Sequence, residues 1–180
     1  MSKQKIDDND DIDDIDEDTQ KDKYLTFKLG SDSFGIDILH VTEIVGMQLI
    51  TAVPNLQEHL KGIINLRGKI IPVMDVRLRF KKDIREYDER TCIIVVDINE
   101  ISIGLIVDRV SEVVDIQEIN ISLPPNIGKN THNRYVKFIG KIGEDVTLIL
   151  DCEKLLLYEE LKDLAEISDS AKGDLTPLPA

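Results

Sequence analysis

The sequence predicts a mainly β protein: two small five-stranded barrels of the SH3 or OB type, related by an approximate two-fold axis, with one short helix and a C-terminal helix. Three observations lead to this fold class. The composition favours sheet, with 26 Ile and 13 Val among 180 residues against 8 aromatic residues, because β-branched side chains pack well on pleated surfaces. Short alternating apolar segments are separated by turn residues, and their pattern repeats along the chain.

The first half of the chain reads as two hairpins, an intervening strand and a short helix. Apolar residues alternate in the first segment, and Gly30 to Ser33 supplies a turn before the next. Arg67-Gly68 forms the turn of the second hairpin. Residues Pro54–Leu60, with Asn55 as a candidate cap, predict the short helix. The predicted strands are Tyr24–Leu29, Phe34–Ile38, Val41–Leu49, Ile63–Leu66 and Lys69–Asp75.

The second half repeats this series and ends in a helix. Asn99-Glu100 and Gly143-Glu144 provide tight turns, and Leu123–Arg134, rich in Pro, Asn and Gly, is a long loop. Leucines at helical spacing predict an amphipathic helix over residues 152–167. The predicted strands are Thr91–Ile98, Ile101–Val107, Glu112–Ile119, Lys137–Ile142 and Asp145–Asp151.

An internal duplication relates the two halves. When Gly35 is aligned with Gly104, Val41–Val45 falls on Val110–Val114 without a gap. When Ile63 is aligned with Ile139, Asp75 falls on Asp151. Repeats of this size predict two similar units. A unit of about 65–70 residues buries only a small core, so we expect the units to pack on each other and share apolar residues at their junction.

The chain divides into a body and two tails. Residues 1–22 hold ten acidic residues and three lysines, which predicts an acidic disordered tail because like charges repel. Residues 168–180 are small and polar and contain two prolines, which predicts a flexible tail. The expected divisions of the body, residues 23–167, are two barrel subdomains at about 23–88 and 89–151 and the helix at 152–167.

The charge distribution argues against nucleic-acid and lipid partners. The net charge is −13, of which residues 1–22 carry −7 and the rest −6, so neither part offers a basic footprint. The sequence contains no apolar run of the roughly 18–20 residues that span a bilayer and no signal-peptide pattern. Cys92 and Cys152 match no metal or redox spacing. We therefore expect a cytoplasmic protein with reduced thiols and no membrane insertion.

The sequence lacks the residue patterns of an active site. His40, His59 and His132 lie in separate segments and are interpreted as surface or turn residues. Glycine-rich phosphate motifs, nucleophile elbows and zinc-protease motifs are absent from the sequence. No catalytic residue, metal ligand or cofactor is expected, which leaves binding as the remaining class of function.

Three segments resemble the CheW family of bacterial chemotaxis coupling proteins. Residues 60–80 read LKGIINLRGKIIPVMDVRLRF, in which NLRG followed by Pro72 and Asp75 forms the specific core. Residues 34–44, FGIDILHVTEI, resemble the family's second strand and the segment after it, and residues 104–113, GLIVDRVSEV, resemble the equivalent stretch of its second half. The resemblance covers about residues 23–157 and implies the family's two five-stranded barrels packed about a pseudo-two-fold axis.

The resemblance implies a non-catalytic adaptor that couples the cytoplasmic domains of chemoreceptors (methyl-accepting chemotaxis proteins) to the regulatory domain of a CheA-type histidine kinase, recruited to membrane-bound receptor arrays. The alternative is a regulatory or spacer barrel that binds the kinase or its own kind without receptor contact. A nucleic-acid or small-ligand barrel is disfavoured, because such barrels use aromatic platforms and a positive groove, whereas this acidic chain has no Trp.

Arg67 is the leading candidate for the receptor surface. Alone it would be a solvated turn residue, but the resemblance places it on the receptor-facing surface, and its guanidinium suits helix carboxylates and carbonyl ends. Val41 and Ile44 fit a core equally well, yet the repeat of Val41–Val45 as Val110–Val114 predicts an apolar groove with a polar rim for a helical hairpin. The predicted receptor-binding residues are Val41, Glu43, Ile44, Leu66, Arg67 and Val110.

The kinase surface is expected at the barrel ends, because the resemblance implies that partner barrels meet end to end through loops. Each candidate fits a plain turn residue equally well. The predicted kinase-binding residues are Gly62, Asn99, Glu100, Gly143 and Glu144.

Overall fold

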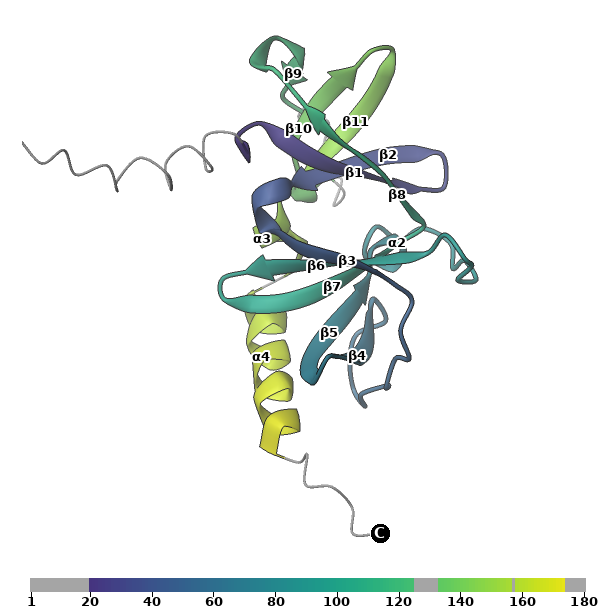
Figure 1. Ribbon diagram of the computed structural model, residues 1–180, viewed down its shortest axis with the longest axis vertical. Coiled ribbons are helices and arrows are strands. Elements are labelled where there is room, and N and C mark those ends of the chain that lie inside the picture. Colours follow the sequence, from purple (N-terminus) through teal and green to yellow (C-terminus); the bar gives the residue numbers. More distant parts are fainter. Residues whose placement is uncertain (1–19, 125–132, 157, 174–180) are drawn as a thin grey trace, which may run out of the picture.

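Two β-sheets, one above the other in Figure 1, form the body of the protein. The structure is a computed structural model and describes residues 20–124, 133–156 and 158–173. One sheet has five strands and the other has six, so the prediction of a mainly β fold with two small sheets is confirmed.

The lower sheet, sheet II, has the strand order β3-β6-β7-β5-β4. Its neighbours are antiparallel except β5 and β7, which are parallel. Its two outer strands approach each other, because Thr51, which follows β3, exchanges backbone hydrogen bonds of 2.8 and 2.9 Å with Ile63 of β4. This bridge closes the sheet into a barrel. The strands are β3 (Val41–Gly46), β4 (Leu60–Leu66), β5 (Lys69–Asp75), β6 (Cys92–Ile98) and β7 (Ile101–Val107).

The upper sheet, sheet I, has the strand order β8-β1-β2-β11-β10-β9. Its parallel pair is β2 with β11. The strand β9 contributes only two residues, so sheet I has five full strands like sheet II. The strands are β1 (Lys23–Leu29), β2 (Asp32–Asp37), β8 (Arg109–Asp115), β9 (Ile121–Ser122), β10 (Val136–Ile142) and β11 (Asp145–Leu150).

The internal duplication is visible in the strand order. Under the two alignments given above, β8-β1-β2-β11-β10 of sheet I corresponds to β3-β6-β7-β5-β4 of sheet II. Each sheet nevertheless takes strands from both halves, because β2 pairs with β11 and β7 pairs with β5. The predicted subdomains at 23–88 and 89–151 are therefore wrong: the first hairpin of each half completes the sheet of the other half.

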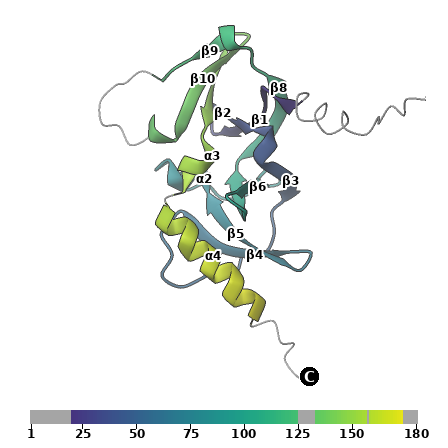
Figure 2. The same cartoon turned by 90° about the vertical axis from the view of Figure 1, so that its left-hand side faces the viewer.

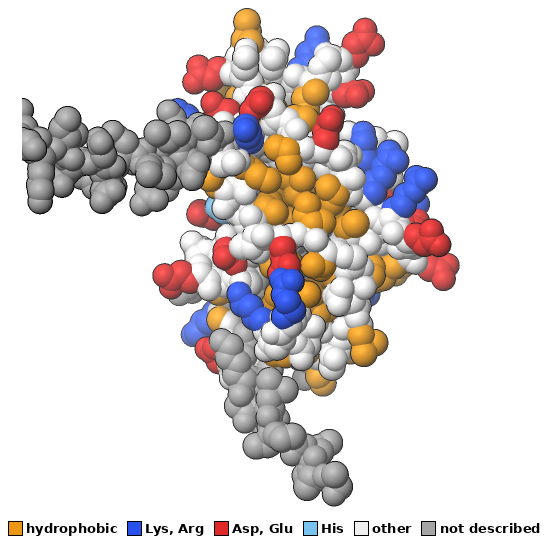
Figure 3. All heavy atoms as spheres, in the orientation of Figure 1, with side chains coloured by type: hydrophobic (Ala, Val, Ile, Leu, Met, Phe, Trp, Pro, Cys, Tyr) orange, Lys and Arg blue, Asp and Glu red, His pale blue; other side chains and the backbone are white. Residues whose placement is uncertain are grey.

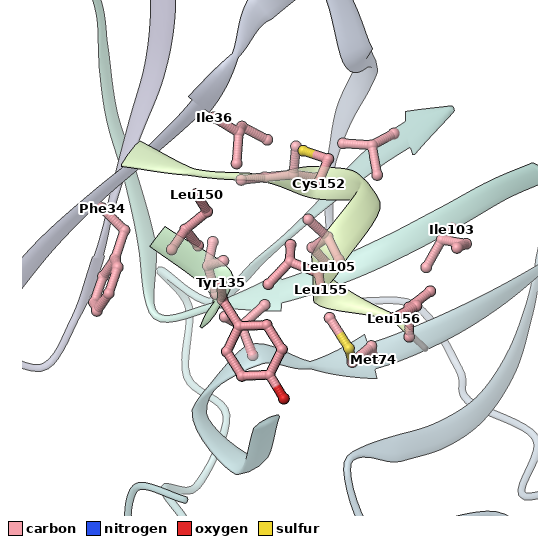
Figure 4. Close-up of a cluster of buried hydrophobic side chains, with 14 of the residues drawn as sticks. Phe34, Ile36, Met74, Ile103, Leu105, Tyr135, Leu150, Cys152, Leu155 and Leu156 are labelled. Carbon is pink, nitrogen blue, oxygen red and sulfur yellow. The ribbon is translucent and has the colours of Figure 1, made fainter. Parts of the chain in front are cut away.

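The largest apolar cluster lies between the two sheets. This shared cluster includes Phe27 of sheet I and Ile94 and Leu105 of sheet II, all fully buried. Smaller clusters fill the individual barrels, around Ile64 in sheet II and around Phe138 in sheet I. Figure 4 shows side chains of the shared cluster meeting from both sheets and from the C-terminal part of the chain. The expected sharing of apolar residues at the junction is confirmed.

Two short helices begin at the equivalent aspartates. The helix α2 (Val76–Arg79) follows Asp75, whose carboxylate accepts a hydrogen bond of 2.9 Å from the backbone N–H of Arg77. The helix α3 (Cys152–Leu155) follows Asp151, whose carboxylate accepts one of 3.0 Å from the backbone N–H of Glu153. Both aspartates therefore act as N-caps.

The short helix predicted at Pro54–Leu60 is not formed. Turns occupy most of this stretch, and Asn55 has a φ of 64°, which is incompatible with a right-handed helix. Leu60 already pairs with Met74 as the first residue of β4. The pattern of one cap and a few apolar residues was too short to distinguish a helix from a turn entering a strand.

The C-terminal helix consists of two parts. Leu156, after α3, has an extended backbone, and α4 (Tyr158–Gly173) continues beyond residue 167 into the predicted tail. The prediction of one helix over 152–167 is therefore wrong in two respects: the helix is interrupted after α3, and it ends beyond residue 167. Figure 2 shows α4 beside sheet II and extending past it, while Leu155, Leu156 and Leu164 are buried in the shared cluster.

Most of the other predicted irregular segments lie outside the described residues. These are the greater part of the acidic tail, the long loop after Leu123 and the last seven residues. At the inner end of the acidic tail, the carbonyl of Asp22 accepts a hydrogen bond of 3.0 Å from the backbone N–H of Ile116. Residue 22 is thus attached to the body.

Candidate functional site

The turn between β4 and β5 presents Arg67 to solvent. Arg67 and Gly68 have φ values of 51° and 85°, the left-handed backbone of a tight two-residue hairpin turn. The side chain of Asn65 stabilises the turn by accepting a hydrogen bond of 2.8 Å from the backbone N–H of Gly68. The Arg67 side chain is 73% exposed, so the turn holds the guanidinium away from the core.

Glu43 of β3 orients this guanidinium. Nη2 of Arg67 donates to Oε1 of Glu43 at 2.6 Å and to Oε2 at 2.5 Å. The pair joins the two outer strands of sheet II on the barrel surface, beyond the Thr51 bridge. Ion pairs this exposed contribute only about 0.2–1 kcal/mol to folding. The pair therefore serves to position a charged group more than to stabilise the barrel.

The strands β3 and β8 carry the same irregularity at equivalent positions. The register shifts within β3 opposite β6 and within β8 opposite β1. At the shift in β3, the hydroxyl of Thr42 donates to the carbonyl of Val95 at 3.1 Å. At the shift in β8, the hydroxyl of Thr26 donates to the carbonyl of Glu112 at 2.8 Å. Bulges redirect side chains at sheet edges, and here they do so at both duplicated strands.

Apolar side chains of β3 and β8 meet the surface near the junction of the two sheets. Val41 and Val110 are half-buried and pack against the shared cluster, while Ile44 and Val113 are 44% and 50% exposed. Figure 3 shows hydrophobic side chains gathered on this face, over the region between the sheets in Figure 1. An exposed apolar area of this kind is typical of an interaction site.

The structure brings together two pairs of the six predicted receptor residues. Glu43 and Arg67 are in direct contact, and Val41 and Val110 pack on the same cluster from different sheets. Leu66 is half-buried and packs against the inner cluster of sheet II, so it supports the hairpin beneath Arg67.

The predicted kinase residues lie at three separate places. Asn99 and Glu100 form the exposed tip of the β6–β7 hairpin, both with positive φ. Gly143 and Glu144 form the exposed tip of the β10–β11 hairpin on the other sheet. Gly62 is buried within β4, and a Cβ there would lie 2.1 Å from the carbonyl oxygen of Thr51. The prediction of Gly62 as a loop contact is therefore wrong: its role is to let two backbones approach.

A buried ionic cluster was missed by the sequence analysis. Nε2 of His59 lies 3.0 Å from Oε1 of Glu160, and Nη1 of Arg79 lies 3.2 Å from the same oxygen. The side chains of Arg79 and Glu160 are 7% and 4% exposed, and Arg79 lies over the ring of Tyr135 at 4.9 Å. The cluster attaches α4 to the body. His59 does lie in a turn, as the sequence predicted, but it is buried and not at the surface.

In the sequence, only the internal duplication indicated that His59 has a structural position of its own. The alignment that places Asp75 on Asp151 also places His59 on Tyr135, and the carbonyls of both accept hydrogen bonds from the backbone N–H groups of these capping aspartates at 2.8 Å. His40 is half-buried, with Nδ1 3.4 Å from the carbonyl of Asp97. His132 lies outside the described residues.

Within the parts of the chain that the structure describes, no group of three or more His, Cys, Asp or Glu side chains could hold a metal ion. Among those same residues, no helix is both long and apolar enough to cross a bilayer.

The comparisons of this chain with known proteins agree on one family. The family model described as CheW-like domain matches residues 23–160. A relative from Klebsiella aerogenes named chemotaxis protein CheW is 35% identical over 148 residues, which cover 82% of this chain and 89% of that protein. A protein of the same name from Treponema pallidum is 29% identical over 147 residues, covering 79% and 86%.

A solved structure shares the fold. The crystal structure of the scaffolding protein TtCheW from Thermoanaerobacter tengcongensis matches with a TM-score of 0.70 and 38% sequence identity. The match covers 74% of this chain and 91% of that one.

Proposed function

Because the chain belongs to the CheW-like domain family, we propose that it is a non-catalytic chemotaxis scaffold that couples the cytoplasmic domains of chemoreceptors to the regulatory domain of a CheA-type histidine kinase. The observation that carries the proposal is the family match over residues 23–160, which includes every strand of both sheets. The proposed place of action is the cytoplasmic side of a membrane, at receptor arrays.

The proposed receptor surface consists of Arg67, Glu43 and the apolar side chains of β3 and β8 beside the junction. A helical hairpin would bury the half-exposed apolar residues, such as Ile44, and would offer carboxylates or carbonyl ends to Arg67. Because Nη2 of Arg67 is held by Glu43 and the side chain is 73% exposed, the guanidinium is oriented before the partner arrives. Such preorganisation lowers the entropic cost of binding.

The proposed kinase surface consists of the two exposed hairpin tips, Asn99-Glu100 and Gly143-Glu144. They belong to different sheets, so one scaffold offers one tip from each barrel. The Gly143-Glu144 tip belongs to sheet I, whereas Arg67 is at the β4–β5 turn of sheet II. Separate surfaces are what a coupling protein requires, since receptor and kinase must bind at the same time.

The test is a reconstitution with purified components. Kinase phosphorylation activity is measured with the chain alone, with a receptor cytoplasmic fragment alone, and with both. The proposal expects activation only when the chain and the receptor fragment are present together. Activation by the chain without receptor would instead support a spacer that binds the kinase alone, and nucleotide hydrolysis by the purified chain itself would contradict a non-catalytic scaffold.

A further inference from the structure

We propose that the acidic N-terminal segment of this chain docks on a basic surface beside the β1–β2 hairpin. The basic surface consists of Lys28, Lys81, Lys82, Arg85, Arg90 and Arg109, which line two neighbouring crevices that share Gly30 and Arg85. Figure 3 shows Lys and Arg side chains gathered at the right-hand edge of that face, near the end of the β1–β2 hairpin in Figure 1. This inference is independent of the proposed coupling function.

The basic surface holds cations that the described residues leave unneutralised. Three of the four acids lining the crevices are already engaged: Asp32 with Lys82, Asp88 with Arg85, and Asp108 with Arg77 and Arg85. Within the described part of the chain, no ion pair involves the remaining four cations, which are Lys28, Lys81, Arg90 and Arg109. An excess of positive charge is unusual in a chain with a net charge of −13.

Two of these cations oppose each other directly. Lys28 of β1 pairs in register with Arg109 of β8, and like charges at directly opposed positions on neighbouring strands destabilise a sheet. Asp108 lines the same crevice, but its carboxylate is already shared among other donors, accepting hydrogen bonds from the backbone N–H of Gly30 at 2.6 Å and from Arg77 at 3.0 Å, which leaves repulsion between Lys28 and Arg109. An added acidic segment would relieve it.

The charge and the length of the N-terminal segment indicate that this segment occupies the basic surface. Residues 1–22 carry a net charge of −7, and seven aspartates lie between residues 7 and 16. Lys23 begins β1 and Lys28 lies five positions later, about 17 Å away at roughly 3.4 Å per residue. About twelve residues of a flexible chain would have a root-mean-square span of roughly 19 Å, which is enough to bring the middle of the acidic run to the basic surface.

Tethering also favours this segment over a free acidic partner, because a short linker gives an effective concentration in the millimolar range. At the opposite end of β1, Lys23 faces Asp115 of β8 and Lys21 precedes Asp22, so the charges there balance and offer no excess of cations. The segment is therefore attracted toward the hairpin end of β1 and away from its own point of attachment.

The test uses the full-length chain and nuclear magnetic resonance of backbone amides. The native chain is compared with a full-length variant in which the seven aspartates between residues 7 and 16 are replaced by Asn, which leaves the segment neutral. We expect chemical-shift differences concentrated at the basic surface, and their loss between about 0.1 M and about 1 M salt as the Debye length falls from about 10 Å to about 3 Å. No difference, or differences centred elsewhere, would overturn the proposal.

Paired variants test the surface itself. Adding Lys28→Gln and Arg109→Gln should reduce the shift differences severalfold, whereas Lys137→Gln, which removes an exposed cation on β10, should leave them unchanged. Lys81→Gln with Arg90→Gln is the second pair, because both side chains are exposed and their replacement disturbs no strand pairing. Differences that fade on dilution would show a segment from another copy as the occupant and would overturn the intramolecular docking.

Discussion

Gly62 is the single residue on which closure of sheet II depends most. A Cβ at this position would lie 2.1 Å from the carbonyl oxygen of Thr51, and the φ of 139° is unfavourable for any other residue. We predict that Gly62→Ala destabilises the protein by more than about 1 kcal/mol, which lowers the melting temperature by about 2–4 °C for each kcal/mol. Gly46→Ala is the control, because nothing lies within 4 Å of a Cβ there. Equal melting temperatures for the two variants would contradict this role.

Cys152 should be chemically inert in the folded protein. Burial raises the pKa of its thiol to about 12, so only about one molecule in 10⁴ carries the reactive thiolate at pH 8. We predict that iodoacetamide labels the half-buried Cys92 first and reaches Cys152 only at the rate of unfolding, as measured by mass spectrometry of the labelled peptides. Rapid labelling of Cys152 in the native protein would contradict the buried position.

The raised pKa of Cys152 also determines how the stability of the protein changes at alkaline pH. A thiol whose pKa is raised from 9.0 to about 12 stays neutral in the folded chain while the unfolded chain ionises. The contribution of this thiol to the free energy of unfolding is fully present below about pH 9 and is lost as the pH rises toward about 12. Denaturant unfolding should therefore give decreasing stability across this window, and Cys152→Ala should flatten that part of the curve.

At the scale of elements, one buried carboxylate helps to attach α4 to the body, beside the apolar contact of Leu164 with the shared cluster. Glu160 contacts both His59 and Arg79, and the side chain of Arg79 is only 7% exposed. We predict that Glu160→Ala destabilises the protein by about 3 kcal/mol, because it leaves a buried cation without its counter-ion. Circular dichroism during denaturation checks this, with the exposed Glu166→Ala on the same helix as the control. If both variants melted alike, the ionic cluster would not hold α4.

Secondary-structure elements could be predicted where the recurrence of residue types identifies them. Alternation located the strands, and the duplication predicted the two similar sheets, because both signals depend only on which residue types recur. The helix predicted at Pro54–Leu60 failed because the left-handed Asn55 is not visible in apolar spacing. The subdomain boundary failed for a similar reason: sequence repeats tell which strands are equivalent, and they do not tell which strands exchange between halves.

The candidate site was predictable only in part. Arg67 and Glu43 were each identified, but their contact joins residues 24 positions apart and depends on closure of the barrel. Glu160 and His59 are 101 positions apart, and no periodicity connects them. Gly62 was mistaken for a loop residue because a glycine needed for close backbone approach looks the same in sequence as one needed for a turn.

The whole molecule should fold as one cooperative unit. Leaving aside the two-residue β9, each half contributes two or three strands to each sheet, and the largest apolar cluster lies between the sheets. We predict a single calorimetric transition for the full chain, and no stable fold for an isolated fragment of residues 23–88, which contains no complete sheet. Far-ultraviolet circular dichroism of the fragment checks this. A cooperatively melting fragment, or two separated transitions in the full chain, would contradict the strand exchange.

We propose that the Arg67 surface binds receptor while the hairpin tips bind kinase. Calorimetric titration of the native chain and of Arg67→Ala with each partner tests it most directly. Truncation of an interface arginine costs about 2 kcal/mol, so receptor affinity should fall about 30-fold, while kinase affinity and the melting temperature stay unchanged. Lys137→Ala, which removes an exposed cation from β10, is the control and should leave both affinities near native. Loss of kinase affinity with receptor affinity intact would contradict the assignment of the two surfaces.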